Sequence, residues 1–132
     1  MLREQLNRLA GELSLPPPAE QPKGHFAFQL APQVQVDLRS LEPGLTLSGV
    51  VTSLPKQALE DLFLLLMRAN YLGRGTGGGK IGLSPDEKSL TLTHDIPYEL
   101  SYDAFKRSVE DFINYLLYWR EEVAQFERER LQ

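Results

Sequence analysis

The chain has 132 residues and a formal net charge of −4, with no cysteine and two histidines. Its length suits one domain over residues 1–132 that buries enough surface to fold without a disulfide or structural metal. The absence of cysteine excludes disulfides, a thiol nucleophile and metal sites with cysteine ligands. The acidic balance argues against non-specific nucleic-acid binding, which depends on neutralising phosphates.

The N-terminal segment, residues 1–14, is predicted to form a short amphipathic helix. Leucines recur there at helical spacing between polar and charged residues. The run Pro16–Pro18 ends the helix, because proline donates no N–H and disfavours a helical conformation of the residue before it. We expect a surface connector from there to Pro22. The segment also lacks the continuous apolar core of a signal peptide.

Three antiparallel strands are predicted between residues 25 and 51. Apolar residues alternate with polar ones in each run, which is typical of strands with one packed and one wetter face. Short turns at 31–32 and 42–44 favour antiparallel pairing of neighbours. The alternating apolar residues are Phe26, Phe28, Leu30, Val34, Val36, Leu38, Leu45, Leu47 and Val51.

A helix from Pro55 to about Asn70 is predicted next, with Ser53 as its N-cap. This helix is apolar nearly all round, whereas a helix lying on one sheet needs an apolar stripe of only about 100°. Its run 62–67 is the longest apolar run, at six residues, and about 20 are needed to cross a bilayer. We therefore expect no membrane span, a cytoplasmic location, and a second subunit that covers the excess apolar surface.

The remaining residues predict a loop, two strands and a long helix. The loop 73–82 holds six of the ten glycines, and the strands carry Ile81 and Leu83, then Leu90 and Leu92. The long helix begins at about Ser101, its N-cap, and its charged end over 120–132 is expected to fray. The predicted fold is α+β, a dimeric two-layer α-β-β-β-α-β-β-α domain with a twisted antiparallel sheet.

The glycine loop offers a weak nucleotide-binding motif. Gly73, Gly75 and Gly78 match G-x-G-x-x-G, but that motif binds a pyrophosphate where it follows a strand and opens a helix. Here it follows a helix and leads into a strand. A flexible turn that lets backbones approach closely, at an interface, is the favoured interpretation.

The sequence offers little for catalysis or metal binding. His25 and His94 have no local partner set, although a Ser-His-Asp site assembles in space and is not visible as a motif. The sequence contains no histidines and carboxylates at the spacing that is typical of metal ligands. We expect no catalytic residue, cofactor or metal, and keep a small enzyme using the glycine loop and His94 as an alternative.

The second half of the chain resembles the class I type III secretion chaperones, the CesT/SycE-type or Tir chaperone family. The resemblance covers residues 59–123 well, and covers the first half only by element order. A leucine-rich helix ends in Ala69-Asn70, a glycine loop and two short strands follow, and the last helix carries a late Trp119-Arg120. The runs Pro16–Pro18 and Gly77–Gly79 are richer than the family pattern.

The resemblance implies a small cytoplasmic, non-enzymatic dimer from a Gram-negative bacterium. Such a chaperone binds the N-terminal region of a secreted effector in extended form, keeps it soluble and presents it to the secretion apparatus. Expected partners are therefore an effector, a second copy or a different chaperone subunit, and components of the apparatus. The alternative is a regulatory protein of the same fold that sequesters a secretion or transcription regulator.

Two sets of residues are predicted to carry these functions. Edge strands offer unpaired backbone groups and apolar pockets to an extended client. The predicted effector-binding residues are Leu2, Leu6, Leu9, Phe26, Phe28, Val34 and Val36, although sequence alone does not separate them from the core. The predicted dimer-interface residues are Leu62, Leu65, Leu66, Ala69, Ile81 and Leu83.

Overall fold

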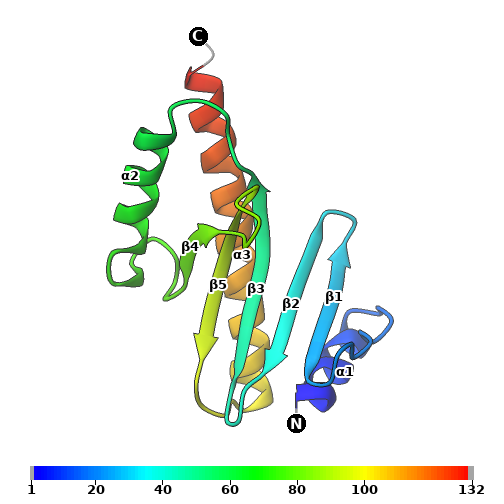
Figure 1. The fold of residues 1–132 in the computed structure, drawn as a ribbon. Coiled ribbons are helices and arrows are strands. Elements are labelled where there is room, and N and C mark those ends of the chain that lie inside the picture. Colours follow the sequence, from blue (N-terminus) through cyan, green and yellow to red (C-terminus); the bar gives the residue numbers. More distant parts are fainter. Residues whose placement is uncertain (1, 131–132) are drawn as a thin grey trace. The chain divides into compact units, whose positions relative to one another are not determined.

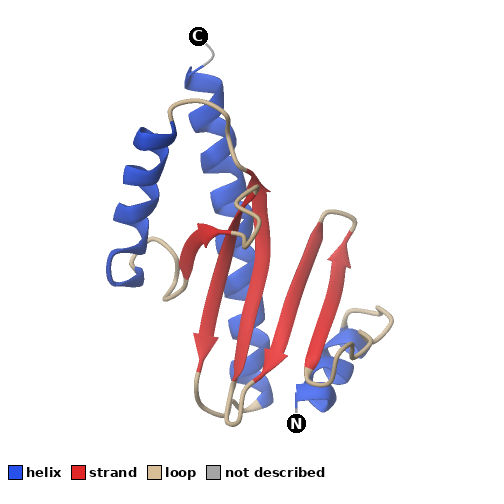
Figure 2. Cartoon of the chain, in the orientation of Figure 1, coloured by secondary structure: helices blue, strands red, loops and turns tan. Residues whose placement is uncertain are grey.

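The computed structural model describes residues 2–130 (Figure 1). Its elements are helix α1 (Leu2–Glu12), strands β1 (His25–Ala31), β2 (Val34–Ser40) and β3 (Leu45–Ser53), helix α2 (Leu59–Asn70), the 3-10 turn η1 (Tyr71–Gly73), strands β4 (Lys80–Leu83) and β5 (Ser89–Ile96), and helix α3 (Tyr102–Arg130). This order confirms the predicted α+β class and the element order α-β-β-β-α-β-β-α, and the predicted dimer stays a prediction. Figure 2 shows the helices and the five-stranded antiparallel sheet, whose order is β1-β2-β3-β5-β4.

Contacts divide the chain into two compact units. Unit 1 comprises residues 1–48 and 95–113, and unit 2 comprises residues 49–94 and 114–132. Strands β3 and β5 and helix α3 contribute residues to both. Among the helices of the described residues, none is long and apolar enough to cross a membrane.

The core of unit 1 comes from α1, the first three strands and the start of α3. The predicted alternation is present in most of the three strands, where the residues that were expected to pack are buried and their neighbours are more exposed. Leu30 and Val34, on either side of the β1–β2 turn, are only half-buried. The Gln5 side chain donates to the Leu100 carbonyl at 2.9 Å, which joins α1 to the segment before α3. The Ser101 hydroxyl accepts from the Ala104 N–H at 3.2 Å, which confirms the predicted N-cap.

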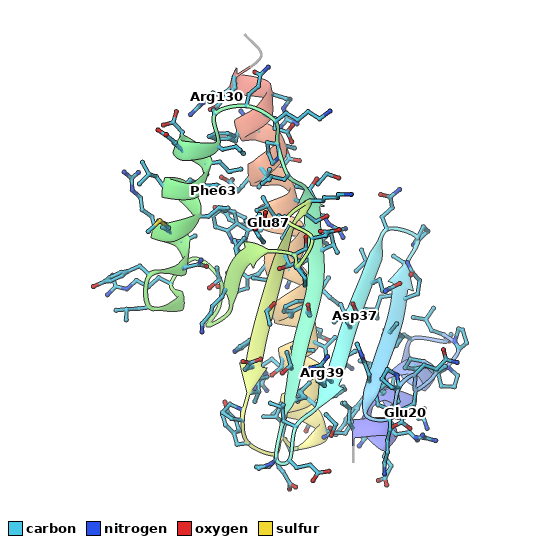
Figure 3. The ribbon with its side chains drawn as sticks, viewed as in Figure 1. Glu20, Asp37, Arg39, Phe63, Glu87 and Arg130 are labelled. Atoms are coloured by element: carbon cyan, nitrogen blue, oxygen red, sulfur yellow. The ribbon has the colours of Figure 1, made fainter. Side chains whose placement is uncertain are left out.

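The core of unit 2 comes from α2, the β4–β5 hairpin and the second half of α3. Helix α3 continues to Arg130, so the expected fraying is wrong for residues 120–130, and residues 131–132 lie outside the described part of the chain. Val123 and Phe126 are buried, and Arg130 lies at the end of α3 (Figure 3). Its guanidinium is 3.9 Å from the Asp61 carboxylate of α2. Apolar packing of the last turns therefore outweighs their many charges.

Helix α2 begins four residues later than the sequence predicts. The Leu54 N–H donates to the Lys88 carbonyl at 2.9 Å, which holds the chain after β3 in a non-helical path. Ala58 then adopts the left-handed conformation, with φ of 56°, and no side chain caps the helix. The predicted start at Pro55 and the N-cap at Ser53 are therefore wrong, because a long-range backbone contact overrides the local signals.

Candidate binding surfaces

Helix α2 carries two apolar stripes on different sides. The inner stripe, Leu62, Leu66 and Ala69, is at most 8% exposed and belongs to the core of unit 2. The outer stripe is defined here as Leu64, Met67 and Tyr71, which follow at helical spacing and are 52%, 67% and 64% exposed. An exposed apolar stripe beside a complete core indicates an interaction surface.

The structure divides the predicted dimer-interface residues between core and surface. Leu62, Leu66, Ala69 and Ile81 are buried within the protomer, Leu65 is half-buried, and Leu83 is 44% exposed at the end of β4. The sequence predicted only that the helix is apolar nearly all round and did not separate the outer stripe from the inner one. Helical spacing alone could not tell which stripe faces the core.

Residue Leu72, just after α2, extends the exposed apolar surface. It is 75% exposed and has φ of 54°, a conformation that a leucine rarely adopts. The left-handed residue lies in η1, between α2 and the glycine loop. Neither helical periodicity nor a turn motif signals this position in the sequence.

The glycine loop packs tightly against the rest of unit 2. The Trp119 indole N–H of α3 donates to the Gly75 carbonyl at 2.8 Å. A Cβ at Gly77, whose φ is +64°, would lie 2.4 Å from the Tyr115 ring, and a Cβ at Gly78 would lie 3.2 Å from the His94 imidazole. Glycine here permits close approach, as predicted, and fixes the end of α2 against α3.

The same loop is poorly arranged to hold a phosphate. The Gly75 N–H donates to Ala69 at the end of α2 at 2.9 Å, and the Gly78 N–H donates to the Gly73 carbonyl at 3.0 Å. Thr76 and Gly79 also donate within the loop. A phosphate cradle needs free N–H groups directed at the ligand, so this geometry speaks against a nucleotide site.

Asn70 closes one edge of the sheet. Strand β4 is an edge strand, and the Asn70 side-chain amide donates to the Ile81 carbonyl and accepts from the Ile81 N–H, both at 2.8 Å. An edge strand otherwise presents unpaired backbone groups to other chains. The amide of Asn70 thus takes the place that a neighbouring strand would occupy at Ile81.

At the other edge of the sheet, β1, the backbone contacts seen within residues 2–130 beyond β2 lie at the beginning of the strand. Glu20 forms a β-bridge with Phe26 and lies beside the start of β1 (Figure 3), and the Gln21 N–H donates to the His25 carbonyl at 2.9 Å. Backbone direction alternates along a strand, so Gln29 points its backbone groups to the same side as His25, away from β2. This half of β1 offers an edge to an extended chain.

The predicted effector-binding residues lie mainly in the core of unit 1. Leu2, Leu6, Leu9, Phe26, Phe28 and Val36 are at most 6% exposed, whereas Val34 is half-exposed at the start of β2. Leu30, at the end of β1, is also half-exposed. Among the apolar residues of β1 and β2 that were expected to pack, those near the β1–β2 turn are therefore the ones that reach the surface.

A polar network joins the surfaces of α1 and α3 in unit 1. The Tyr102 hydroxyl donates to Glu12 at 2.7 Å, the Lys106 ammonium lies 3.1 Å from the same carboxylate, and the Arg8 guanidinium lies over the Tyr102 ring at 3.9 Å. The bond from Tyr102 and then that from Lys106 lower the pKa of Glu12. Desolvation and then the Glu12 carboxylate raise the pKa of Tyr102 to about 12.

The histidines show no catalytic arrangement. His25 belongs to unit 1 and His94 to unit 2, and His94 packs against the glycine loop. Within residues 2–130, no group of three or more histidines and carboxylates could hold a metal ion.

Comparison with known sequences identifies a family model and a relative that match this chain. The model of the Tir chaperone protein (CesT) family matches residues 4–120. A Chlamydia pneumoniae protein designated CPj0713/CpB0740 is 34% identical over 76 residues, which are 57% of this chain and 58% of that protein. The match therefore spans less than two thirds of that relative.

Solved structures share the fold at low sequence identity. The ExsC–ExsE complex contains a chain with a TM-score of 0.70 and 18% identity, covering 91% of both chains. The HopA1–SchA chaperone–effector complex gives 0.69 and 17%, covering 91% of this chain and 93% of the other. The Yersinia pestis type III secretion chaperone SycH, bound to a fragment of YscM2, gives 0.68 and 17%, covering 90% and 99%.

Proposed function

Because the chain belongs to the Tir chaperone protein (CesT) family, we propose that it binds the N-terminal region of a type III secreted effector. The chaperone keeps this client extended, soluble and competent for secretion, and helps to deliver it to the apparatus. It works in the cytoplasm without catalysis, cofactor or metal. The observation that carries the proposal is the family match over residues 4–120; the relatives solved with bound proteins support it.

The client adds to the sheet at the open half of β1. Asn70 occupies the outer backbone groups of Ile81 on β4, whereas the outer backbone groups of Gln29 point away from β2. Strand addition supplies backbone hydrogen bonds, and neighbouring pockets accept alternate side chains of the added strand. Val34 and Leu30 contact the client directly, while Leu6, Phe28 and the other buried residues of the predicted set form the floor beneath it.

A second copy of the chain covers the outer stripe of α2. Leu64, Met67 and Tyr71, together with exposed Leu72 and Leu83, offer apolar area that an isolated protomer leaves in water. Interfaces of homodimers are more apolar than other surfaces. The rigid attachment of the glycine loop to α3 through Trp119 keeps this face in one orientation, which favours a fixed partner.

The client proposal is tested by purifying the tagged full chain from its native host and identifying bound proteins by mass spectrometry. A larger exported protein, bound through its N-terminal region, is the expected partner. Gln29→Pro removes one outward N–H and should reduce client capture, whereas Gln29→Ala keeps the N–H and serves as the matched control. Equal capture by both variants contradicts strand addition at β1, and a partner that is not exported favours the regulatory alternative.

The dimer proposal is tested by light scattering of the purified chain at micromolar concentration. The wild type should have the mass of two copies, and Met67→Glu should have the mass of one, because it would bury a carboxylate in the apolar contact. Leu13→Glu, at a side chain 45% exposed in unit 1, is the control. A monomeric wild type without a second chaperone subunit among its partners contradicts the proposal.

A further inference from the structure

Unit 1 contains a pocket at one end of its strands. Of the residues predicted to bind a client or a second copy, only Leu2 lines it. The pocket has a volume of ≈ 350 Å³, near the lower end of the range of about 300–1,000 Å³ for ligand pockets. Four leucines, Leu2, Leu41, Leu45 and Leu100, give it apolar walls, and Glu42 and Glu99 also line it. Leu2 belongs to the predicted effector-binding set, so the pocket adjoins that region.

The walls of this pocket are held in place by specific contacts. Gly44, in the β2–β3 turn, has φ of +100°, and a Cβ there would lie 1.9 Å from the Ile96 carbonyl oxygen. The Leu41 N–H closes the turn by donating to the Gly44 carbonyl at 2.9 Å. On the opposite wall, Gln5 holds Leu100 through its hydrogen bond. The pocket is therefore preformed by the fold of unit 1.

The charges at this pocket favour a cationic ligand. Glu42 and Glu99 are exposed, and within residues 2–130 neither takes part in an ion pair. No lysine or arginine lines the pocket among the described residues.

The net charge of the whole protein resides in the unit that contains the pocket. Unit 1 has six Lys and Arg against ten Asp and Glu, a net charge of −4, and unit 2 has eight of each, a net charge of zero. Such a field raises the local concentration of cationic partners and their rate of association. The local and the overall charge thus favour the same sign of ligand.

We propose that this pocket binds an aliphatic side chain of the client that is flanked in the client sequence by lysine or arginine. The inference rests on the proposed chaperone function and adds a chemical class of client segment to it. The leucines take the aliphatic side chain, and Glu42 and Glu99 pair with the neighbouring cations. A client segment with acidic residues around the same side chain is disfavoured, because it would bring like charges together.

The test is an NMR titration of the isotope-labelled full chain with short synthetic peptides. The probe peptide is Gly-Ser-Lys-Leu-Lys-Ser-Gly, and the comparison peptide has glutamate in place of both lysines. The probe should shift the amide signals of residues 41–45 and 98–100, with about fivefold higher affinity than the comparison peptide, as expected for two exposed ion pairs. Raising the salt from about 0.05 to 0.5 M should abolish that difference.

Charge-neutral variants separate the pocket from the general acidity of unit 1. The double variant Glu42→Gln and Glu99→Gln should lose about fivefold in affinity for the probe. The matched control, Glu110→Gln with Asp111→Asn, removes two exposed charges from α3 outside the pocket and should bind as the wild type does. Equal loss in both double variants shows non-specific attraction and overturns the proposal.

Two further outcomes decide between this inference and the function on which it rests. No signal shift at probe concentrations up to about 5 mM overturns the pocket assignment. If the native client binds the wild type and the Glu42/Glu99 double variant equally, the pocket assignment fails and the chaperone function stands. If no exported protein is captured by the wild type, the chaperone function fails, whatever the peptide titration shows.

Discussion

Replacing Leu6 with alanine should destabilise the protein by about 3 kcal/mol, within the range of about 2–5 kcal/mol for leucine-to-alanine changes in cores. Leu6 lies on α1 and is 0% exposed, so the change leaves a cavity among buried neighbours. Val34→Ala, at a half-exposed position, should cost about 1 kcal/mol, because the Val34 side chain buries less apolar surface on folding than Leu6 does. Domains have total stabilities of about 5–15 kcal/mol, so the Leu6 variant stays folded at low temperature.

Urea denaturation followed by circular dichroism, at one fixed protein concentration, measures both free energies of unfolding. The two variants should also separate in function. At low temperature Val34→Ala weakens capture of the client without a comparable loss of stability, whereas Leu6→Ala binds in proportion to its folded fraction. A loss of stability below about 1 kcal/mol for Leu6→Ala would refute the core assignment and return Leu6 to the exposed client surface.

Three further predictions concern the contacts that position these surfaces. Gly77→Ala should cost about 2–4 kcal/mol in urea denaturation, from its positive φ and its ring contact, whereas Gly11→Ala, with nothing within 4 Å, should be neutral or stabilising. Trp119→Phe should lose about 1 kcal/mol with its hydrogen bond. The pKa of Tyr102 is raised to about 12 from 10.0, so the neutral hydroxyl stabilises the folded state. This stabilisation is complete below pH 10 and is lost as the pH rises through 12. Thermal unfolding should show the loss in the wild type and a smaller loss in Tyr102→Phe.

The order of elements was predictable because its signals are local. Alternating apolar residues define the first three strands, and the pairing of Phe28 with Val36 follows from the short turn between them. The Ser101 cap and the stop at Pro16–Pro18 likewise depend on neighbours in sequence. The start of α2 was not predictable, because the bond between Leu54 and Lys88 joins residues far apart in the chain.

The candidate sites were less predictable than the fold, because both functional sets rest on apolar residues. A pattern of leucines gives the spacing of an apolar face but not the depth at which the face is packed. On β1, the alternation that made Phe28 a candidate for client contact also places it on the packed face of the strand, where it is buried. No sequence motif signals the Asn70 bonds to Ile81, because the two residues are separated in the chain by the glycine loop and meet only in the folded structure.

Helix α2 shows why an excess of apolar residues predicts a partner but not its position. The sequence contains more apolar surface than one sheet can cover, and this excess is independent of how the helix is rotated about its axis. The rotation decides that Leu62 and Leu66 enter the core and that Leu64 and Met67 remain in water. Tertiary contacts at the C-terminal end of α2 are consistent with that rotation: Asn70 is bound to β4 and the following loop to Trp119. The glycine loop lies directly after the exposed stripe and is bound to α3, so we expect Gly77→Ala to disturb the end of α2 and to weaken the proposed dimer, although residue 77 is not part of the proposed contact.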